Sequence, residues 1–243
     1  MRFEADLHVH SIASGHAFST VADNVQAAAK KGLKLIAITD HGPQMPDGPH
    51  PYYFRNMRVL PKNYLGVEIL KGIEANIIDE KGNIDIPEDL AKNLDIVLAG
   101  FHPYCSPSGT VVENTRTMIK AINNPLIDMI VHPGNPEFQV DPTEIVLACK
   151  EKGTLLEINS SSLGSIGSRA GSYGNCLAIA EKVVEHGLKV AIGSDAHWAE
   201  QVGDFSLAVE LASKVGLKES QVINTSIQEI YLYLQKKARM MGD

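Results

Sequence analysis

Short runs of Val, Ile, Leu and Ala recur along the chain, and most of them end at a histidine or a carboxylate. Runs of this length, bounded by turn residues and almost free of polar positions, are typical of strands that are buried on both faces. They predict seven strands, which we place within the following segments: Asp6–Ser11, Leu33–His41, Val67–Glu74, Asp95–His102, Leu126–His132, Thr154–Asn159 and Leu188–His197.

The segments between these runs carry helix signals. Thr20–Lys31 is rich in Ala and stops at Gly32, as expected for a helix with a glycine at its C-terminus. Asp141 followed by Pro142 gives an N-cap and a first-turn proline. The other predicted helices begin near Pro87, Val111, Tyr173, Asp204 and Ser226, and residues 76–86 read as a hairpin that turns at Lys81-Gly82-Asn83.

One Pro-rich stretch interrupts this alternation. Residues 43–51 hold four prolines and Gly48, and we expect no regular element there. A long loop beside a site is often a lid, but a merely exposed excursion fits the composition equally well. His50 lies in this loop and follows no strand, so we leave it out of the candidate ligands.

Strands that alternate with helices predict a parallel sheet with right-handed crossovers. Potential ligands follow nearly all of the strands, and they could share one pocket only if the sheet closes on itself, because the two edges of an open sheet lie far apart. Barrel enzymes keep their active sites at the C-terminal ends of the strands. We therefore predict a (β/α)7 barrel, a distorted TIM-like barrel, as one domain over residues 1–243.

Seven of the nine histidines occupy these strand ends or the loop just beyond the first strand. His8 and His10 are two residues apart and therefore point to one face of their strand, as Asp195 and His197 do. Imidazoles and carboxylates that converge in this way are ligands for zinc-like ions. The candidate metal ligands are His8, His10, His16, His41, Glu74, His102, His132, Asp195 and His197. Asp40 precedes its histidine, so we expect it to face the other side of its strand and support the site from behind.

The composition of the chain indicates which partners and which cellular location to expect. The formal charge of −7, with Lys and Arg scattered along the chain, gives no basic surface for nucleic acid. No stretch reaches membrane-spanning length, and the N-terminus has no apolar signal-peptide core. The three cysteines have no Cys-x-x-Cys spacing, which favours reduced thiols and a cytoplasmic protein. The sequence leaves open whether the chain forms a homo-oligomer.

Six motifs, in order along the whole chain, resemble the PHP (polymerase and histidinol phosphatase) family of metal-dependent phosphoesterases, and in particular its small bacterial YcdX-type subgroup of probable phosphatases. The motifs are Asp6-Leu7-His8-Val9-His10-Ser11, Thr39-Asp40-His41, Gly72-Ile73-Glu74-Ala75-Asn76, His102-Pro103, His132-Pro133 and Ser194-Asp195-Ala196-His197. The resemblance implies a distorted (β/α)7 barrel with three divalent ions, of which zinc is favoured and Mn or Fe are alternatives.

The same resemblance implies how the ligands are shared. One ion would be held by His8, His10, Glu74 and Asp195, a second by Glu74, His102 and His132, and a third by His16, His41 and His197. The expected activity is hydrolysis of a phosphomonoester on a small metabolite by metal-bound hydroxide. The alternatives are a metal-dependent amidohydrolase or esterase, and a non-catalytic or polymerase-associated PHP module.

Arg169 lies in a Gly/Ser-rich loop that follows the sixth strand. A guanidinium there could hold phosphate oxygens in a bidentate fork, so we take Arg169 as the candidate substrate-binding residue. A solvated surface arginine is the alternative. Cys105 and His186 are read as structural residues.

Overall fold

A computed structural model describes residues 1–165 and 169–242 of the chain. Its strands are β1 (Ala5–Val9), β2 (Leu35–Ile38), β3 (Asn63–Tyr64), β4 (Val67–Asn76), β5 (Ile96–Gly100), β6 (Met129–Ile130), β7 (Leu155–Asn159) and β8 (Val190–Gly193). Its α-helices are α1 (Val21–Lys30), α2 (Pro51–Asn56), α3 (Glu88–Ala91), α4 (Val111–Ile122), α5 (Pro142–Lys152), α6 (Tyr173–His186), α7 (Ser206–Val215) and α8 (Ile227–Gly242). Short 3₁₀ turns join them, of which η1 (Ile12–Ser14) and η5 (Ala199–Gln201) border the strand ends.

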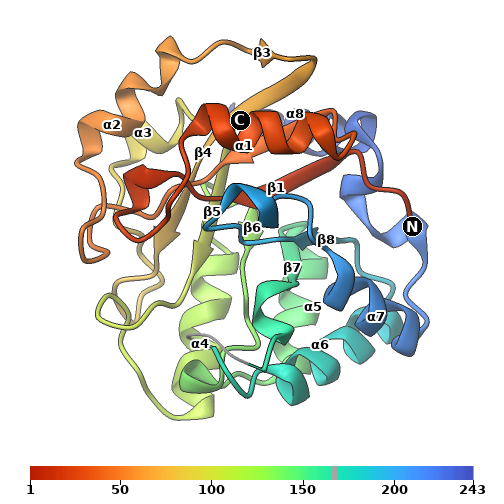
Figure 1. Cartoon of the computed structure of the whole chain (residues 1–243). Helices are drawn as coiled ribbons and strands as arrows, with labels where there is room; N and C mark the ends of the chain where they lie inside the picture. Colours follow the sequence, from red (N-terminus) through yellow and green to blue (C-terminus); the bar gives the residue numbers. More distant parts are fainter. Residues whose placement is uncertain (166–168, 243) are drawn as a thin grey trace.

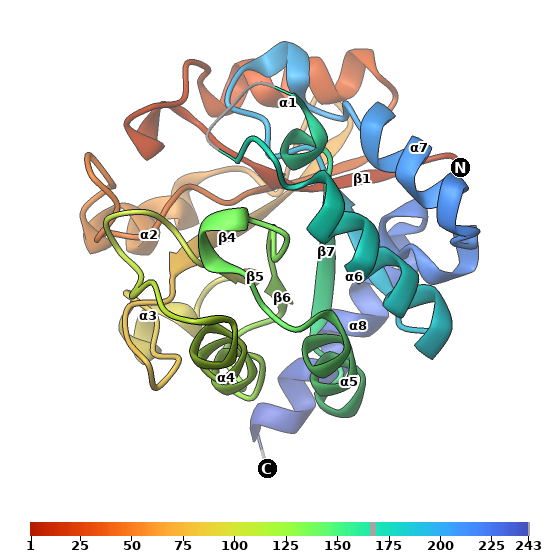
Figure 2. The same ribbon diagram turned by 90° about the horizontal axis from the view of Figure 1, so that it is seen from below.

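Seven of these strands form one parallel sheet in the order β1-β2-β4-β5-β6-β7-β8. The two ends of this sheet meet, because the N–H of His10 donates to the carbonyl of Ala196 at 2.9 Å and the N–H of Asp195 donates to the carbonyl of His8 at 3.0 Å. The sheet is therefore a nearly closed barrel, with helices around its outside (Figures 1 and 2). The (β/α)7 prediction is confirmed.

Two hydrophobic clusters explain why these short strands are buried on both faces. The larger one fills the space between the sheet and the outer helices. The smaller one lies inside the barrel, where Leu7, Leu98 and Met129 belong to the same cluster as Ile230 of α8. Helix α8 thus packs against the residues that fill the barrel. None of the described helices is both long and apolar enough to cross a lipid bilayer.

The helix starts follow the predicted capping chemistry. The side chain of Asp141 accepts hydrogen bonds from the N–H groups of Thr143 and Glu144 at 2.8 and 3.0 Å. Thr20 and Asp23 form a capping box at the start of α1. Side-chain acceptors at these positions satisfy N–H groups that have no partner within the helix, so the loops after β1 and β6 end at fixed points.

Three regions differ from the sequence prediction. Pro51 does not belong to an irregular loop but opens α2, where the ring nitrogen of His50 accepts from the N–H of Tyr52 at 3.1 Å. A proline fits the first position of a helix because no N–H is needed there. The two-residue strand β3 pairs antiparallel with β4 and was not predicted. Strand β6 is shorter than expected because Ile127 turns back onto the carbonyl of Asn124.

Candidate metal centre

All nine predicted ligands come together at the C-terminal ends of the strands, around the carboxylate of Glu74. This residue lies near the end of β4 and is fully buried. Its Oε1 lies 2.6 Å from Nε2 of His132 and 2.9 Å from Nε2 of His102. Its Oε2 lies 2.8 Å from Nδ1 of His41. One carboxylate thus faces side chains from three other strand ends.

Asp195 forms a second centre of contacts on the opposite side of the barrel. Its Oδ1 lies 3.2 Å from Nε2 of His10 and 3.5 Å from Nδ1 of His197. The ring of His16, from the loop after β1, stacks on His197 with centroids 5.0 Å apart and on His41 with centroids 4.9 Å apart. The residue that sequence analysis placed in a loop therefore reaches the same cluster.

Three groups of three side chains have ligand atoms that all lie within 4.8 Å of one another in the described part of the chain. The groups are His8, His10 and Glu74; His41, Glu74 and His102; and His10, His41 and His197. The first group lies within one of the ligand sets implied by the family resemblance. The other two combine His41 or His10 with members of different sets. The structure therefore brings the nine residues together without reproducing that division of the ligands.

The donor set fits divalent ions. Oε2 of Glu74 and Nδ1 of His41 lie 2.8 Å apart but do not form a hydrogen bond with each other. These two atoms and Nδ1 of His102 are buried without a hydrogen-bond partner among the described residues. Buried polar atoms in proteins normally have partners, and a cation would satisfy these. Burial also lowers the pKa of His10, His102 and His132, which favours the neutral imidazole that binds metals.

The charge state of Glu74 agrees with this role. Burial alone would raise the pKa of its carboxyl group, but His102, His41 and His8 around it hold that pKa well below the usual range. The pKa of Asp195 is held low in the same way, against burial, by Arg169 and His8. Both carboxyl groups are therefore ionised and available as anionic ligands.

Glu157 is the functional residue that sequence analysis missed. Its Oε1 lies 2.8 Å from Nδ1 of His8, and its Oε2 accepts from the N–H of His132 at 2.9 Å. Gly193 makes room for it, because a Cβ there would lie 1.9 Å from Oε1. A carboxylate on the outer nitrogen of a ligand histidine fixes the tautomer and the ring orientation. The sequence signal was the position of Glu157 on the same face of its strand as Asn159, near the strand's C-terminal end.

We expect Glu157→Gln to weaken metal binding by on the order of 10- to 100-fold, because outer partners of ligand histidines typically contribute that much. Titration of the metal-free variant with zinc measures the affinity directly. Glu151→Gln, an exposed position on α5, is the matched control. Equal affinities in the two variants would remove Glu157 from the metal centre.

A similar chain of contacts supports His10. Oγ of Ser14 lies 3.0 Å from Nδ1 of His10 and donates to Oδ1 of Asp40 at 2.7 Å. Asp40 also accepts from the hydroxyl of Tyr53 at 2.6 Å. Asp40 therefore acts on the centre through Ser14, which is the supporting position that the sequence predicted for it.

Two predicted ligands have unusual backbone conformations. His132 has a φ of 32° and Asp195 a φ of 56°, in the region that residues other than glycine rarely adopt. Such conformations persist where the surrounding structure holds them and are common at functional sites. Here they turn both side chains toward Glu74 and His10 immediately after short strands.

The Pro-rich loop is fixed to its neighbours at two points. The N–H of Gln44 donates to Oδ2 of Asp85 at 2.8 Å, and its carbonyl accepts from Sγ of Cys105 at 3.2 Å. A Cβ on Gly42 would lie 2.2 Å from Asp85, so the carboxylate needs the glycine. Residues 42–44 thus join β2 to the segment after β4 and border the centre.

Arg169 lies against the predicted metal ligands and not on the open surface. Its side chain is 14% exposed and forms an ion pair with Oδ2 of Asp195. Its Nε donates to Oγ of Ser162 at 2.8 Å. The alternative of a solvated surface arginine is therefore wrong, because the guanidinium borders the cluster of predicted ligands.

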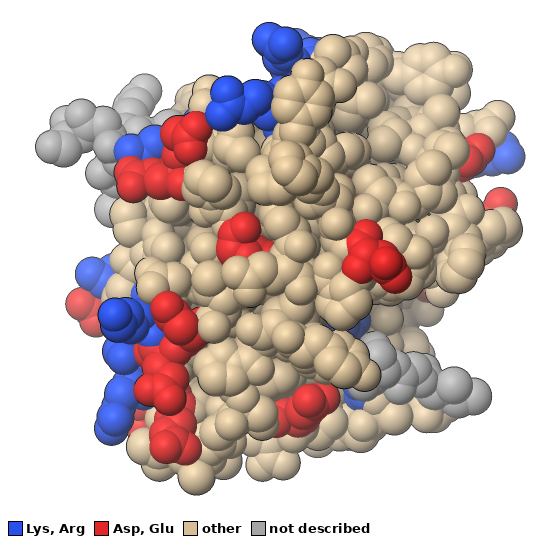
Figure 3. Space-filling model, turned by 90° about the vertical axis from the view of Figure 1, so that its left-hand side faces the viewer, with Lys and Arg blue, Asp and Glu red and all other residues tan. Residues whose placement is uncertain are grey.

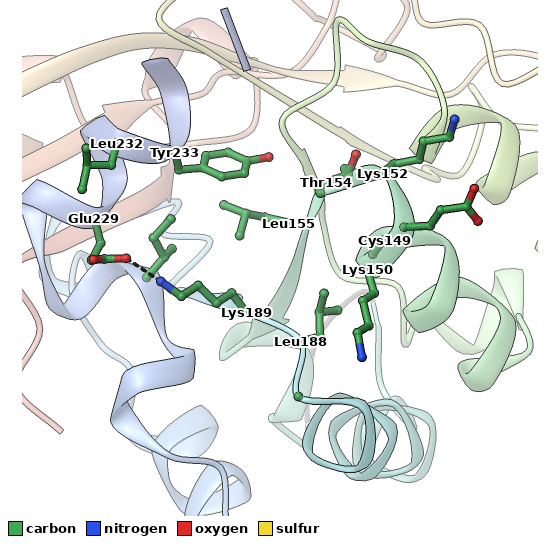
Figure 4. Close-up of a pocket in the computed structure, with 14 residues that line it drawn as sticks. Cys149, Lys150, Lys152, Thr154, Leu155, Leu188, Lys189, Glu229, Leu232 and Tyr233 are labelled. Atoms are coloured by element: carbon green, nitrogen blue, oxygen red, sulfur yellow. Dashed lines mark hydrogen bonds and ion pairs between the residues drawn. The ribbon is translucent and has the colours of Figure 1, made fainter. Parts of the chain in front are cut away.

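A separate hollow of about 550 Å³ lies at the other end of the barrel, between α5, β8 and α8. Figure 4 shows that its lysine side chains point in different directions. Lys189 pairs with Glu229, and Lys150 donates to the carbonyl of His186 at 2.8 Å. The hollow therefore lacks the converging polar groups that mark a ligand site.

Comparison with known proteins agrees with this geometry. A "probable phosphatase" of Caldanaerobacter subterraneus subsp. tengcongensis is 50% identical over 243 residues, which cover 100% of this chain and 95% of that protein. A "probable phosphatase" of Thermoanaerobacter sp. is 48% identical over 243 residues, covering 100% of this chain and 98% of that protein.

A solved structure shares the fold. The histidinol phosphate phosphatase of Lactococcus lactis subsp. lactis, crystallised with zinc, L-histidinol and phosphate, matches with a TM-score of 0.63 and 17% identity, over 90% of this chain and 95% of that chain. The PHP domain family itself matches residues 6–173. Together with the relatives that align along its whole length, this match shows that the chain belongs to the PHP domain family.

Proposed function

We propose that this protein is a phosphatase that hydrolyses phosphomonoesters of small metabolites at a centre of three divalent metal ions. The observation that carries the proposal is the convergence of seven histidines around two carboxylates, Glu74 and Asp195. The names of the relatives as phosphatases support hydrolysis of phosphoester bonds. The number of ions and the phosphomonoester substrate are our inference from the size of the ligand set.

The residues of the centre have separate roles that suit phosphoryl transfer. Glu74 has one oxygen toward His102 and His132 and the other toward His41, so it can serve two ions. Glu157 and Ser14 orient His8 and His10. Bound divalent ions would supply Lewis acidity toward the phosphoryl oxygens and lower the pKa of water.

Zinc is the favoured metal, because the set is rich in imidazole, and manganese or iron suit the same mixture of nitrogen and oxygen ligands. The zinc in the Lactococcus enzyme supports this choice. The three cysteines, Cys105, Cys149 and Cys176, form no disulfide, which supports our proposal of a cytoplasmic enzyme.

The experiment that tests the function compares three substrates with the zinc-loaded protein. We expect hydrolysis of p-nitrophenyl phosphate to exceed that of bis-p-nitrophenyl phosphate and of p-nitrophenyl acetate. Preference for the diester would reassign the enzyme as a phosphodiesterase. Preference for the acetate would favour an esterase, and no turnover of any of the three would favour a non-catalytic module.

Arg169 provides a second test. We expect Arg169→Ala to lower kcat/KM by on the order of 10²- to 10³-fold, as for loss of one preorganised donor to developing charge. The variant must be compared at constant metal content, because Arg169 also pairs with Asp195. Arg169→Lys, which keeps the charge without the fork, should recover part of the loss. Wild-type kinetics in Arg169→Ala would leave phosphate binding to the metals alone.

A further inference from the structure

The loops around the metal centre contain almost no positive side chains. We define the mouth loops as residues 10–20, 39–50, 101–110, 131–141, 160–172 and 194–205, which follow six of the strands. Residues 166–168 of the fifth loop lie outside the described part of the chain. Arg169 is the only Lys or Arg in the sequence of these loops, and its guanidinium is already engaged with Asp195.

The remaining segment after a strand, residues 77–95, contains two lysines. Lys92 lies at the C-terminal end of α3 and pairs with Glu88 at 2.6 Å, and Lys81 lies at the turn of the segment. This turn packs against the C-terminal end of α4, where Lys120 donates to the carbonyl of Glu80 at 2.7 Å. Helix α4 starts beside the strand ends and runs away from them, so its C-terminal end lies at the opposite side of the barrel. Lys81 is therefore remote from the metal centre.

The charges that the mouth loops do expose are negative. Asp47, Glu137 and Glu200 are exposed carboxylates on three of these loops. Figure 3 shows the side of the molecule that carries η1 and α2 in Figure 1, and its centre is largely uncharged, with acidic side chains between neutral ones. Lys30 and Lys31, at the C-terminal end of α1, approach only the loop of Glu200, where Nζ of Lys31 donates to the carbonyl of Glu200 at 2.6 Å. Apart from Arg169 and bound metal ions, an anionic group on the substrate beyond the phosphate itself would meet no Lys or Arg in the sequence of the mouth loops. The exposed carboxylates would repel such a group.

Apolar side chains occupy the same loops. Tyr104 is 93% exposed and follows His102 by two residues, with a φ of 69°. Phe18 is 72% exposed, and its N–H donates to the carbonyl of His197 at 2.8 Å. The rings of His16, His41 and His102 form a row in which neighbouring centroids are 4.9 Å apart. Phe18 and Tyr104 each follow an end member of this row, His16 or His102, by two residues.

We infer that the substrate is a monophosphate ester whose organic part carries no second anionic group and packs against aromatic side chains at the mouth. The inference rests on the proposed phosphatase function and narrows its substrate class. It excludes bisphosphates, nucleoside polyphosphates and phosphorylated carboxylic acids as good substrates. Aromatic contacts at the mouth would bind the neutral part of the substrate by burying its apolar surface.

The test compares two esters that differ in charge but have leaving phenols of nearly equal acidity, 4-(2-carboxyethyl)phenyl phosphate and its neutral analogue 4-(2-carbamoylethyl)phenyl phosphate. With the zinc-loaded wild-type protein, we expect kcat/KM for the carboxylate to be lower by about tenfold, the ratio given by one uncompensated charge near the site. Equal values, or a preference for the carboxylate, would overturn the inference while leaving the phosphatase function intact. Absence of hydrolysis of both esters and of p-nitrophenyl phosphate would overturn both.

A lysine introduced into a mouth loop tests whether these loops cause the preference for the neutral ester over the carboxylate. Tyr104→Lys or Phe18→Lys should raise the carboxylate-to-carboxamide ratio by about two- to fivefold, the usual size of an exposed ion pair. Tyr64→Lys is the matched control, because Tyr64 is also exposed but lies in β3, beside the N-terminal end of β4. If neither mouth variant changed the ratio more than Tyr64→Lys does, the discrimination would not come from these loops and the inference would fail.

Discussion

Glu74→Gln is expected to lower kcat/KM for p-nitrophenyl phosphate by on the order of 10³-fold or more, since it removes a charge that no other group at the centre replaces. The carboxylate contacts histidines from several strands through both of its oxygens. An amide of the same shape offers one weak acceptor and one donor in place of two anionic oxygens. We expect the bound metal to fall together with the turnover, as measured by elemental analysis of the same sample.

His16→Ala is the variant with which the loss of activity and metal in Glu74→Gln is compared. His16 comes from the loop after β1, is exposed, and stacks at the edge of the cluster on His41 and His197. Water could replace it as a ligand, so we expect a smaller loss of metal and of activity than in Glu74→Gln. Equal losses in the two variants would remove the support for a bridging role of Glu74.

Removal of the metal is expected to abolish hydrolysis and to lower the melting temperature by on the order of 10 °C. Ligands that bind only the folded state stabilise it by about 4 kcal/mol at a thousandfold excess over Kd, and each kcal/mol shifts the melting temperature of a chain of this size by roughly 2–4 °C. Without ions, Glu74, His41 and His102 also keep buried polar atoms that have no hydrogen-bond partner among the described residues. Differential scanning calorimetry before and after dialysis against a chelator measures the shift.

Restoring zinc to the dialysed protein is the control, and both the melting temperature and the activity should return. A melting temperature that chelation leaves unchanged, in a sample shown by elemental analysis to be metal-free, would mean that metal binding does not stabilise the fold. Retained hydrolysis in that sample would contradict a metal-dependent reaction.

The barrel was predictable because each strand is a run of branched apolar residues, and six of the seven runs end at a candidate ligand. The ring closure followed from chemistry, since ligands after six strands, including the first and the last, can meet only if those two strands are neighbours. The structure provides that closure through two backbone hydrogen bonds between the first and last strands, from His10 to Ala196 and from Asp195 to His8. Local pattern was therefore sufficient for the fold class.

Other features depend on contacts that no local pattern contains. Glu157 contacts His8, which is remote in sequence, and needs Gly193 to leave space for it. The contact of Glu157 with His8 can be recognised only when β7, β8 and β1 are placed side by side. The four prolines of residues 43–51 predict no regular element, although the position of Pro51 itself suits the start of a helix.

The division of ligands among the ions was also beyond the sequence. Spacing shows that His41 follows β2, but not whether its ring turns toward His102 or toward His197. The structure places the ring near both, with centroids 4.9 Å from His102 and 5.9 Å from His197. Ligand sets that share His41 in this way cannot be assigned from strand order.

The most direct test is a titration of the metal-free protein with zinc, in which bound metal and p-nitrophenyl phosphate hydrolysis are measured in the same samples. We predict that hydrolysis rises with bound zinc and reaches its plateau at about three ions per chain, because nine nitrogen and oxygen ligands exceed what one or two tetrahedral ions need. Saturation of binding at one ion per chain, or bound zinc without any release of phosphate, would contradict a trinuclear phosphatase.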